Sequence, residues 1–146
     1  ARTKGKGAAI GRAVLADLAR AVTRRAPRMI EFLGDADSAA LISGPGAEQF
    51  QALTGPSFRN EMCARGIVRI AFNRPIRRAA EVQCPTLLII AEYDEIAPSS
   101  AVHEVARRMG PLAEVVAYDC GHFAIYAGNH FEDSVRRQVA FLQRAV

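Results

Sequence analysis

The chain has 146 residues, which is long enough for one domain with a hydrophobic core of its own. Half of the residues are hydrophobic and 23% are charged, with few aromatics, which is typical of a globular protein and excludes a disordered or fibrous one. The net charge is +4, and much of the excess lies in residues 2–28. No aromatic residues are interleaved with these basic ones and no nucleic-acid motif follows, so we interpret them as a solvated helix face and expect no nucleic-acid partner.

No apolar stretch approaches the roughly 20 residues that a membrane span needs, and no charged-then-apolar leader opens the chain. We therefore expect a cytoplasmic protein without a membrane partner. The three cysteines, Cys63, Cys84 and Cys120, are odd in number and widely spaced. This pattern favours free thiols in a reducing compartment over a disulfide framework.

The first half of the chain predicts mainly helices. Apolar residues recur at helical spacing from Ile10 to about Arg25, which indicates an amphipathic helix with a basic outer face that Pro27 ends. Residues 29–33 form a short apolar segment of undetermined type, and residues 35–59 combine short helical patches with glycine and proline turns. Residues 60–72 have the spacing of another helix. We therefore expect residues 1–79 to form a mostly helical segment.

Residues 80–146 follow a different order: strand, helix, strand, helix. This is typical of parallel strands and places the chain in the α/β class. The first helix has Ser99 or Ser100 as a candidate cap and ends at Gly110. The four predicted elements span residues 86–91, about 98–110, 113–118 and 131–146.

The two predicted strands are unbroken apolar runs, as in strands that are buried on both faces. Two such strands cannot cover each other, because each keeps at least one unpaired edge. We therefore expect further strands to come from outside this chain. Without them, the isolated chain is expected to associate with itself through its strand edges.

Two polar residues directly follow these strands. Asp94 comes just after the first strand and His122 just after the second. Because the carboxyl ends of parallel strands meet at one edge of a sheet, both should lie at the same edge, where ligands bind in this class of fold. A histidine there can accept a proton from a nucleophile, and a carboxylate can orient and stabilise the imidazole. Glu92, Glu95 and Asp119 are alternative candidates for the carboxylate.

These residues resemble the C-terminal portion of the α/β-hydrolase superfamily. The resemblance rests on the acid strand and loop from Cys84 through Asp94 to Pro98, on Gly121-His122-Phe123, and on the closing helix. The family's acid loop has the form G-x-x-D-x-x-x-P, and here Ala91 replaces its glycine. The resemblance implies residues 80–146 as the end of the catalytic domain and residues 1–79 as a cap-like segment. It also implies a serine hydrolase, such as an esterase or a peptidase, that hydrolyses a small-molecule acyl substrate with a Ser-Asp-His triad.

A nucleophile for such a triad is not evident in this chain. The family's serine lies in a G-x-S-x-G turn, and the nearest approach, Gly55-Pro-Ser57-Phe-Arg59, has an arginine at the last position and no strand before it. Cys120 is too close to His122 in sequence to be a good candidate. The resemblance implies that the nucleophile, the oxyanion hole and most central strands belong to an N-terminal half of the same protein, upstream of Ala1. The chain alone is then expected to be inactive.

The remaining histidines do not predict a metal site. His103, His122 and His130 lack the close i, i+4 helical pairing and the cysteine partners of a zinc site. We therefore expect neither a metal nor a cofactor. The alternative to a hydrolase is a non-catalytic α/β module that serves in binding or assembly.

Overall fold

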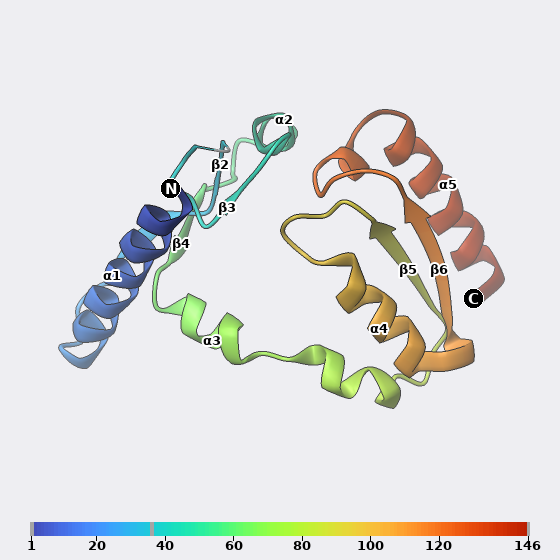
Figure 1. Cartoon of the computed structure of the whole chain (residues 1–146), viewed down its shortest axis with the longest axis horizontal. Coiled ribbons are helices and arrows are strands. Elements are labelled where there is room, and N and C mark those ends of the chain that lie inside the picture. The colour runs from blue at the N-terminus through green and yellow to red at the C-terminus, as the bar shows by residue number, and fades with distance from the viewer. Residues whose placement is uncertain (1, 36, 146) are drawn as a thin grey trace. The chain divides into compact units, whose positions relative to one another are not determined.

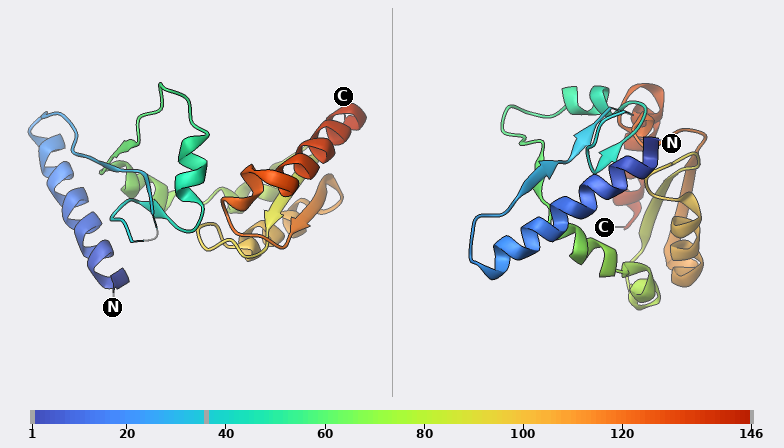
Figure 2. Two further views of the ribbon diagram at one scale, coloured as in Figure 1. Left: turned by 90° about the horizontal axis from the view of Figure 1, so that it is seen from above. Right: turned by 60° about the vertical axis from the view of Figure 1, so that its left-hand side comes forward.

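The structure is a computed structural model that describes residues 2–35 and 37–145, with side chains described from Gly5 onward. It is a mixed α/β fold, about half helical, with short strands. The described residues form two compact units, 1–73 and 74–146, whose elements can be followed in Figures 1 and 2. None of the described helices is both long and apolar enough to cross a bilayer. Arg2 and Lys4, part of the predicted basic face, have side chains outside the described part.

The first unit begins with α1 (Arg2–Val22). This helix starts earlier than the predicted Ile10 and ends before the predicted Arg25. It ends there because the chain turns at Arg24, which has a positive φ of 54°. The Thr23 hydroxyl donates to the carbonyl oxygens of Ala19 and Arg20, which also accept the backbone N–H groups of Thr23 and Arg25 at this end of the helix.

The packed face of α1 is not its most apolar one. Ala13 and Asp17 are buried, whereas Leu15 and Val22 are 69% and 86% exposed. The predicted amphipathic helix implies that its large apolar side chains lie inward, and for Leu15 and Val22 this is wrong. The helix turns Ala13 and the carboxylate of Asp17 toward the unit instead, and the hydrogen bonds of Asp17 hold it in this orientation.

Asp17 is a buried anchor between α1 and two distant loops. One oxygen accepts the Arg28 N–H at 2.6 Å, and the other accepts the Arg65 N–H at 2.9 Å and the Cys63 thiol at 3.3 Å. The Arg65 guanidinium lies 3.3 Å away. Burial raises the pKa of the Asp17 carboxyl, but these donors outweigh it and the net pKa is lowered. The carboxylate is therefore charged and fully satisfied.

Short strands complete the first unit. The strand β1 (Met29–Glu31) pairs antiparallel with β4 (Glu61–Cys63), and β2 (Leu33–Gly34) pairs parallel with β3 (Ile42–Ser43). Two short helices follow β3 and β4, α2 (Ala47–Ala52) and α3 (Gly66–Phe72). The predicted helix over residues 60–72 was wrong at its start, because β4 pairs with β1 there.

The second unit contains the predicted strand–helix–strand–helix order, and its two strands are confirmed. The strands β5 (Thr86–Ala91) and β6 (Ala113–Tyr118) are parallel, with Thr86 opposite Ala113 and Ala91 opposite Tyr118. The helices α4 (Ser99–Met109) and α5 (Gly128–Ala145) lie on opposite faces of this pair (Figure 1). Short 3-10 helices η1 (Pro75–Glu81), η2 (Gly110–Leu112) and η3 (Ala124–Tyr126) connect the elements.

The start of α4 differs from the prediction. No serine side chain caps α4, because Ser99 is already its first helical residue and the N-cap is Pro98. By its contacts the second unit begins at Arg74, because η1 packs against α4.

The core of the second unit lies around the end of β5. Ile90 is 1% exposed, and Ala91, Met109, Cys120 and Phe123 are also buried. The strand β6 is more open than predicted for a strand covered on both faces, because each of its residues is intermediate or exposed and none is buried. Within the described residues, β5 and β6 pair only with each other, so each has an outer edge without a strand neighbour.

Candidate active site

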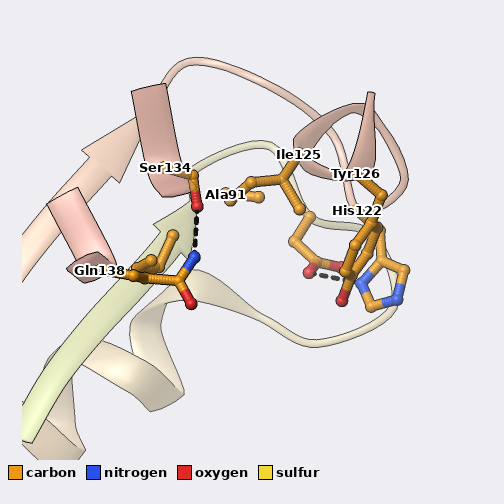
Figure 3. A pocket seen from close by; sticks show the side chains of 8 residues that line it. Ala91, His122, Ile125, Tyr126, Ser134 and Gln138 are labelled. Atoms are coloured by element: carbon orange, nitrogen blue, oxygen red, sulfur yellow. Dashed lines mark hydrogen bonds and ion pairs between the residues drawn. The ribbon is translucent and has the colours of Figure 1, made fainter. Parts of the chain in front are cut away.

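Asp94 and His122 lie together at the carboxyl edge of the β5–β6 pair. The two residues come from the loops that follow these strands, and His122 Nδ1 is 2.7 Å from Asp94 Oδ2 (Figure 3). Their side chains are 26% exposed for His122 and 10% exposed for Asp94. An ionised carboxylate can only accept hydrogen bonds, so the Nδ1 atom donates and the Nε2 atom of the neutral ring is left as an acceptor.

The second oxygen of Asp94 holds its own loop. Asp94 Oδ1 accepts the Ile96 N–H at 2.8 Å and the Ala97 N–H at 2.7 Å. Burial raises the pKa of the Asp94 carboxyl, but the Ala97 N–H, His122 and the Ile96 N–H outweigh it, and the net pKa is lowered. Asp94 is therefore a charged acceptor whose position is fixed independently of His122.

Backbone hydrogen bonds keep the two loops adjacent beyond the ends of the strands. The Glu92 N–H donates to the Tyr118 carbonyl at 2.9 Å, and the Tyr93 N–H donates to the Cys120 carbonyl at 3.0 Å. These bonds continue the parallel ladder toward the site. The sequence places Asp94 and His122 28 residues apart, and the ladder brings them into contact.

Aromatic rings surround the imidazole of His122. The Phe123 ring lies edge-on at a centroid distance of 4.8 Å, and the Tyr126 ring at 6.3 Å with an interplanar angle of 65°. Phe123 is buried, whereas Tyr126 is 43% exposed. Sequence reasoning missed Tyr126, because a three-residue 3-10 turn has no periodicity to reveal it.

A cavity of about 260 Å³ adjoins the pair. Figure 3 shows His122 and Tyr126 on one side of it, and Ser134 and Gln138 of α5 on the other. Gln138 Nε2 donates to the Ser134 hydroxyl at 2.9 Å, and Ser134 is buried. Sequence reasoning did not single out these two polar residues, although their i, i+4 spacing on a helix was visible. The cavity is lined by Ile89, Ala91, Asp94, His122, Ile125, Tyr126, Ser134 and Gln138.

Among the candidate carboxylates, Asp94 is the one that contacts His122 Nδ1. Glu92 instead pairs with His103, with 2.9 Å between Glu92 Oε1 and His103 Nε2. His130 packs edge-on against the Tyr118 ring at 5.5 Å. The three histidines thus have separate partners, and within residues 2–35 and 37–145 no three His, Cys, Asp or Glu side chains are grouped to hold a metal ion.

The cysteines are free thiols, as the sequence predicts. Cys120 is buried, and burial, followed by the charges of Asp119 and Asp94, raises the pKa of its thiol. A thiol with a raised pKa is a poor nucleophile because the thiolate is the reactive form. Ser57, in the nearest approach to a nucleophile turn, is an exposed turn residue of the first unit.

Comparisons with known proteins show a sequence relative and a similar solved structure. The chain is 33% identical over 123 residues to the quorum-quenching protein AidA of Acinetobacter baumannii (strain MDR-ZJ06), which is 82% of this chain and 40% of that protein. It is similar to the structure of DcsB in complex with its substrate analogue, with a TM-score of 0.72 and 19% identity over 98% of this chain and 51% of that one. No family model matches.

The chain therefore spans less than half the length of AidA and about half of the DcsB chain. The likeness to DcsB shows the fold, because its sequence identity is low. The relationship to AidA rests on sequence identity over 82% of this chain. These findings place the chain as a mixed α/β protein related to the quorum-quenching protein AidA and similar in fold to DcsB.

Proposed function

We propose that this chain supplies the acid, Asp94, and the base, His122, of a Ser-Asp-His triad in a serine hydrolase of the α/β-hydrolase superfamily. The 2.7 Å contact between His122 Nδ1 and Asp94 Oδ2 carries this proposal. It leaves His122 Nε2 as the proton acceptor that such a reaction needs. The order of acid and histidine along the chain is also that of the superfamily.

The proposed reaction is hydrolysis of an ester, amide or related acyl bond. His122 Nε2 takes the proton of a serine hydroxyl while the serine oxygen attacks the carbonyl carbon, and Asp94 stabilises the imidazolium that forms. The imidazolium then gives its proton to the leaving group as the carbonyl–leaving-group bond breaks. In the second half His122 removes a proton from water, which attacks the acyl-enzyme and releases the acid and the serine.

The serine is proposed to lie on a polypeptide segment that precedes residue 1, together with the oxyanion hole and the remaining central strands. Two observations support this. The matched proteins are about twice as long as this chain or longer. In addition, the outer edges of β5 and β6 have no strand neighbour within the described residues, and the chain sequence holds no G-x-S-x-G turn.

The substrate class is proposed from the relative. AidA is named as a quorum-quenching protein, and we extend this to a small acylated signal molecule of quorum sensing as the substrate. The cavity beside His122 has apolar walls at Ile89, Ala91 and Ile125. Such walls suit an acyl chain, because burial of its methylene groups is favourable.

The proposal is tested by replacing His122 in the full-length protein that contains this chain. His122→Ala should lower turnover of a chromogenic p-nitrophenyl ester by several powers of ten, since the proton acceptor is lost. His103→Ala is the matched control. It also removes a histidine that pairs with a carboxylate, but His103 lies on α4 with 48% of its side chain exposed. Near-normal hydrolysis by the His122 variant would refute the triad, as would a full-length sequence without a nucleophile turn.

A non-catalytic role in binding or assembly is the second candidate. It is favoured by an apolar stripe on α5, where Phe131, Val135, Val139 and Leu142 are 38% to 57% exposed. Such a stripe suits contact with another polypeptide. A full-length protein that hydrolyses no ester or amide, yet binds a partner through α5, would favour this candidate over the hydrolase.

A further inference from the structure

The turn η3 holds Tyr126 against the imidazole of His122. The Ala124 N–H donates to the Gly121 carbonyl at 3.1 Å, and the Tyr126 N–H donates to the Phe123 carbonyl at 3.2 Å. These hydrogen bonds turn the backbone that follows His122 back toward the His122 side chain. Figure 3 shows Tyr126 beside His122 on the same side of the cavity.

The hydrogen bond to Asp94 fixes one atom of the His122 ring but leaves its plane free to tilt about that contact. The two ring contacts restrict this tilt. Phe123 lies at 4.8 Å and nearly perpendicular, at 88°, and Tyr126 lies at 6.3 Å with 65° between the rings. Edge-to-face arrangements of this kind are the preferred geometry of aromatic pairs. The direction of Nε2 therefore depends on both rings.

Tyr126 differs from Phe123 in its surroundings. Phe123 is buried, whereas Tyr126 is 43% exposed and lines the cavity. A large aromatic ring that is half open to solvent contributes less to a hydrophobic core than a buried one does. Tyr126 lines the cavity beside the imidazole, which is where a ring can orient the histidine.

We propose that Tyr126 is a positioning residue, whose aromatic ring holds the His122 imidazole in the orientation that directs Nε2 toward the nucleophile and shields the His122–Asp94 hydrogen bond from water. This inference rests on the proposed hydrolase function. The ring carries the role, so phenylalanine can replace tyrosine and alanine cannot.

The experiment compares Tyr126→Ala and Tyr126→Phe in the full-length protein. Tyr126→Ala should lower kcat for a p-nitrophenyl ester by about tenfold, and Tyr126→Phe should stay within about twofold of the unmodified protein. The second readout is the Nδ1 proton of His122 in NMR spectra, which should exchange with water faster in the alanine variant only. A residue that merely stabilises the fold would not affect this proton selectively.

Phe131→Ala is the matched control. Phe131 is an aromatic residue of the same unit, and it is 45% exposed, but it does not line the cavity. Its replacement should leave the exchange rate of the His122 Nδ1 proton unchanged. An unchanged kcat and an unchanged exchange rate in Tyr126→Ala would overturn the inference, and so would a loss in Tyr126→Phe as large as in Tyr126→Ala.

The proposed function can fail separately from this inference. If His122→Ala retains normal turnover, the triad is wrong and the catalytic role of Tyr126 is overturned with it, while the exchange rate of the His122 Nδ1 proton still shows whether the Tyr126 ring shields the hydrogen bond to Asp94. If His122→Ala is inactive while Tyr126→Ala turns over normally, the triad stands and only the role of Tyr126 is overturned.

Discussion

Replacing Asp94 with asparagine separates the two functions of this carboxylate. The asparagine oxygen can still accept the N–H groups of Ile96 and Ala97, which lie 2.8 and 2.7 Å from Asp94 Oδ1. The new NH₂ group takes the place of Oδ2, which is 2.7 Å from His122 Nδ1. An NH₂ group donates, so Nδ1 must become an acceptor and the ring proton moves to Nε2. The ring can then no longer take a proton from the nucleophile.

The expected magnitudes follow from these contacts. Reversal of the histidine tautomer should lower kcat by about 10⁴-fold. Each of the two loop hydrogen bonds changes from a charged to a neutral acceptor, which costs about 1 kcal/mol apiece, so the free energy of unfolding should fall by about 2 kcal/mol. Asp94→Ala removes both loop bonds and should lower it by about 4 kcal/mol. Activity and stability therefore change in different proportions in the two variants.

The assay combines ester hydrolysis, denaturant unfolding and ¹⁵N NMR of the imidazole in the full-length protein. The Asp94→Asn spectrum should show the proton on Nε2, and the unmodified protein should show it on Nδ1. An Asp94→Asn variant with turnover within tenfold of normal would refute the reasoning. A ring proton that remains on Nδ1 would do so as well, because the hydrogen-bond assignment would then be wrong.

Three further predictions concern pH, the first unit and association. Folding lowers the pKa of Asp94, so its contribution to stability is present above the pKa of an unfolded aspartate, about 3.9, and is lost as the pH falls through the folded pKa. In a plot of the unfolding midpoint against pH, Asp94→Asn should therefore flatten the fall on the acid side. Asp17→Ala should lower the thermal midpoint by roughly 5 to 10 °C, far more than replacement of the exposed Arg12 on the same helix, yet leave the His122 Nδ1 proton unchanged. The isolated chain should run larger than a monomer in size-exclusion chromatography with light scattering, because the edges of β5 and β6 are open; a stable, folded monomer would contradict this.

The strands and the Asp94–His122 pair could be predicted because their signals are local. The runs at 86–91 and 113–118 are unbroken, apolar and rich in β-preferring residues, and both became strands with those bounds. Once the strands are parallel, residues just beyond their carboxyl ends must share an edge, and this places Asp94 near His122 without further information.

The packing of the first unit could not be predicted in the same way. The helix α1 has apolar residues on more than one side, so its periodicity does not decide which side packs. The outcome depends on Asp17, whose burial is compensated by N–H groups from residues 28 and 65. The strand β4 likewise depends on its pairing with β1, with Met29 opposite Cys63. Partners so distant in sequence leave no local pattern.

The described geometry of the candidate site belongs to the second unit alone. The acid, the base, the two rings beside the imidazole and the polar pair on α5 all come from residues 74–146, and the hydrogen bonds that fix them link elements of that unit. The buried carboxylate of the first unit serves a different purpose, since Asp17 holds α1 to its own neighbours. The contact between His122 Nδ1 and Asp94 Oδ2 therefore depends on residues of the second unit, and the hydrogen bonds of Asp17 do not take part in it.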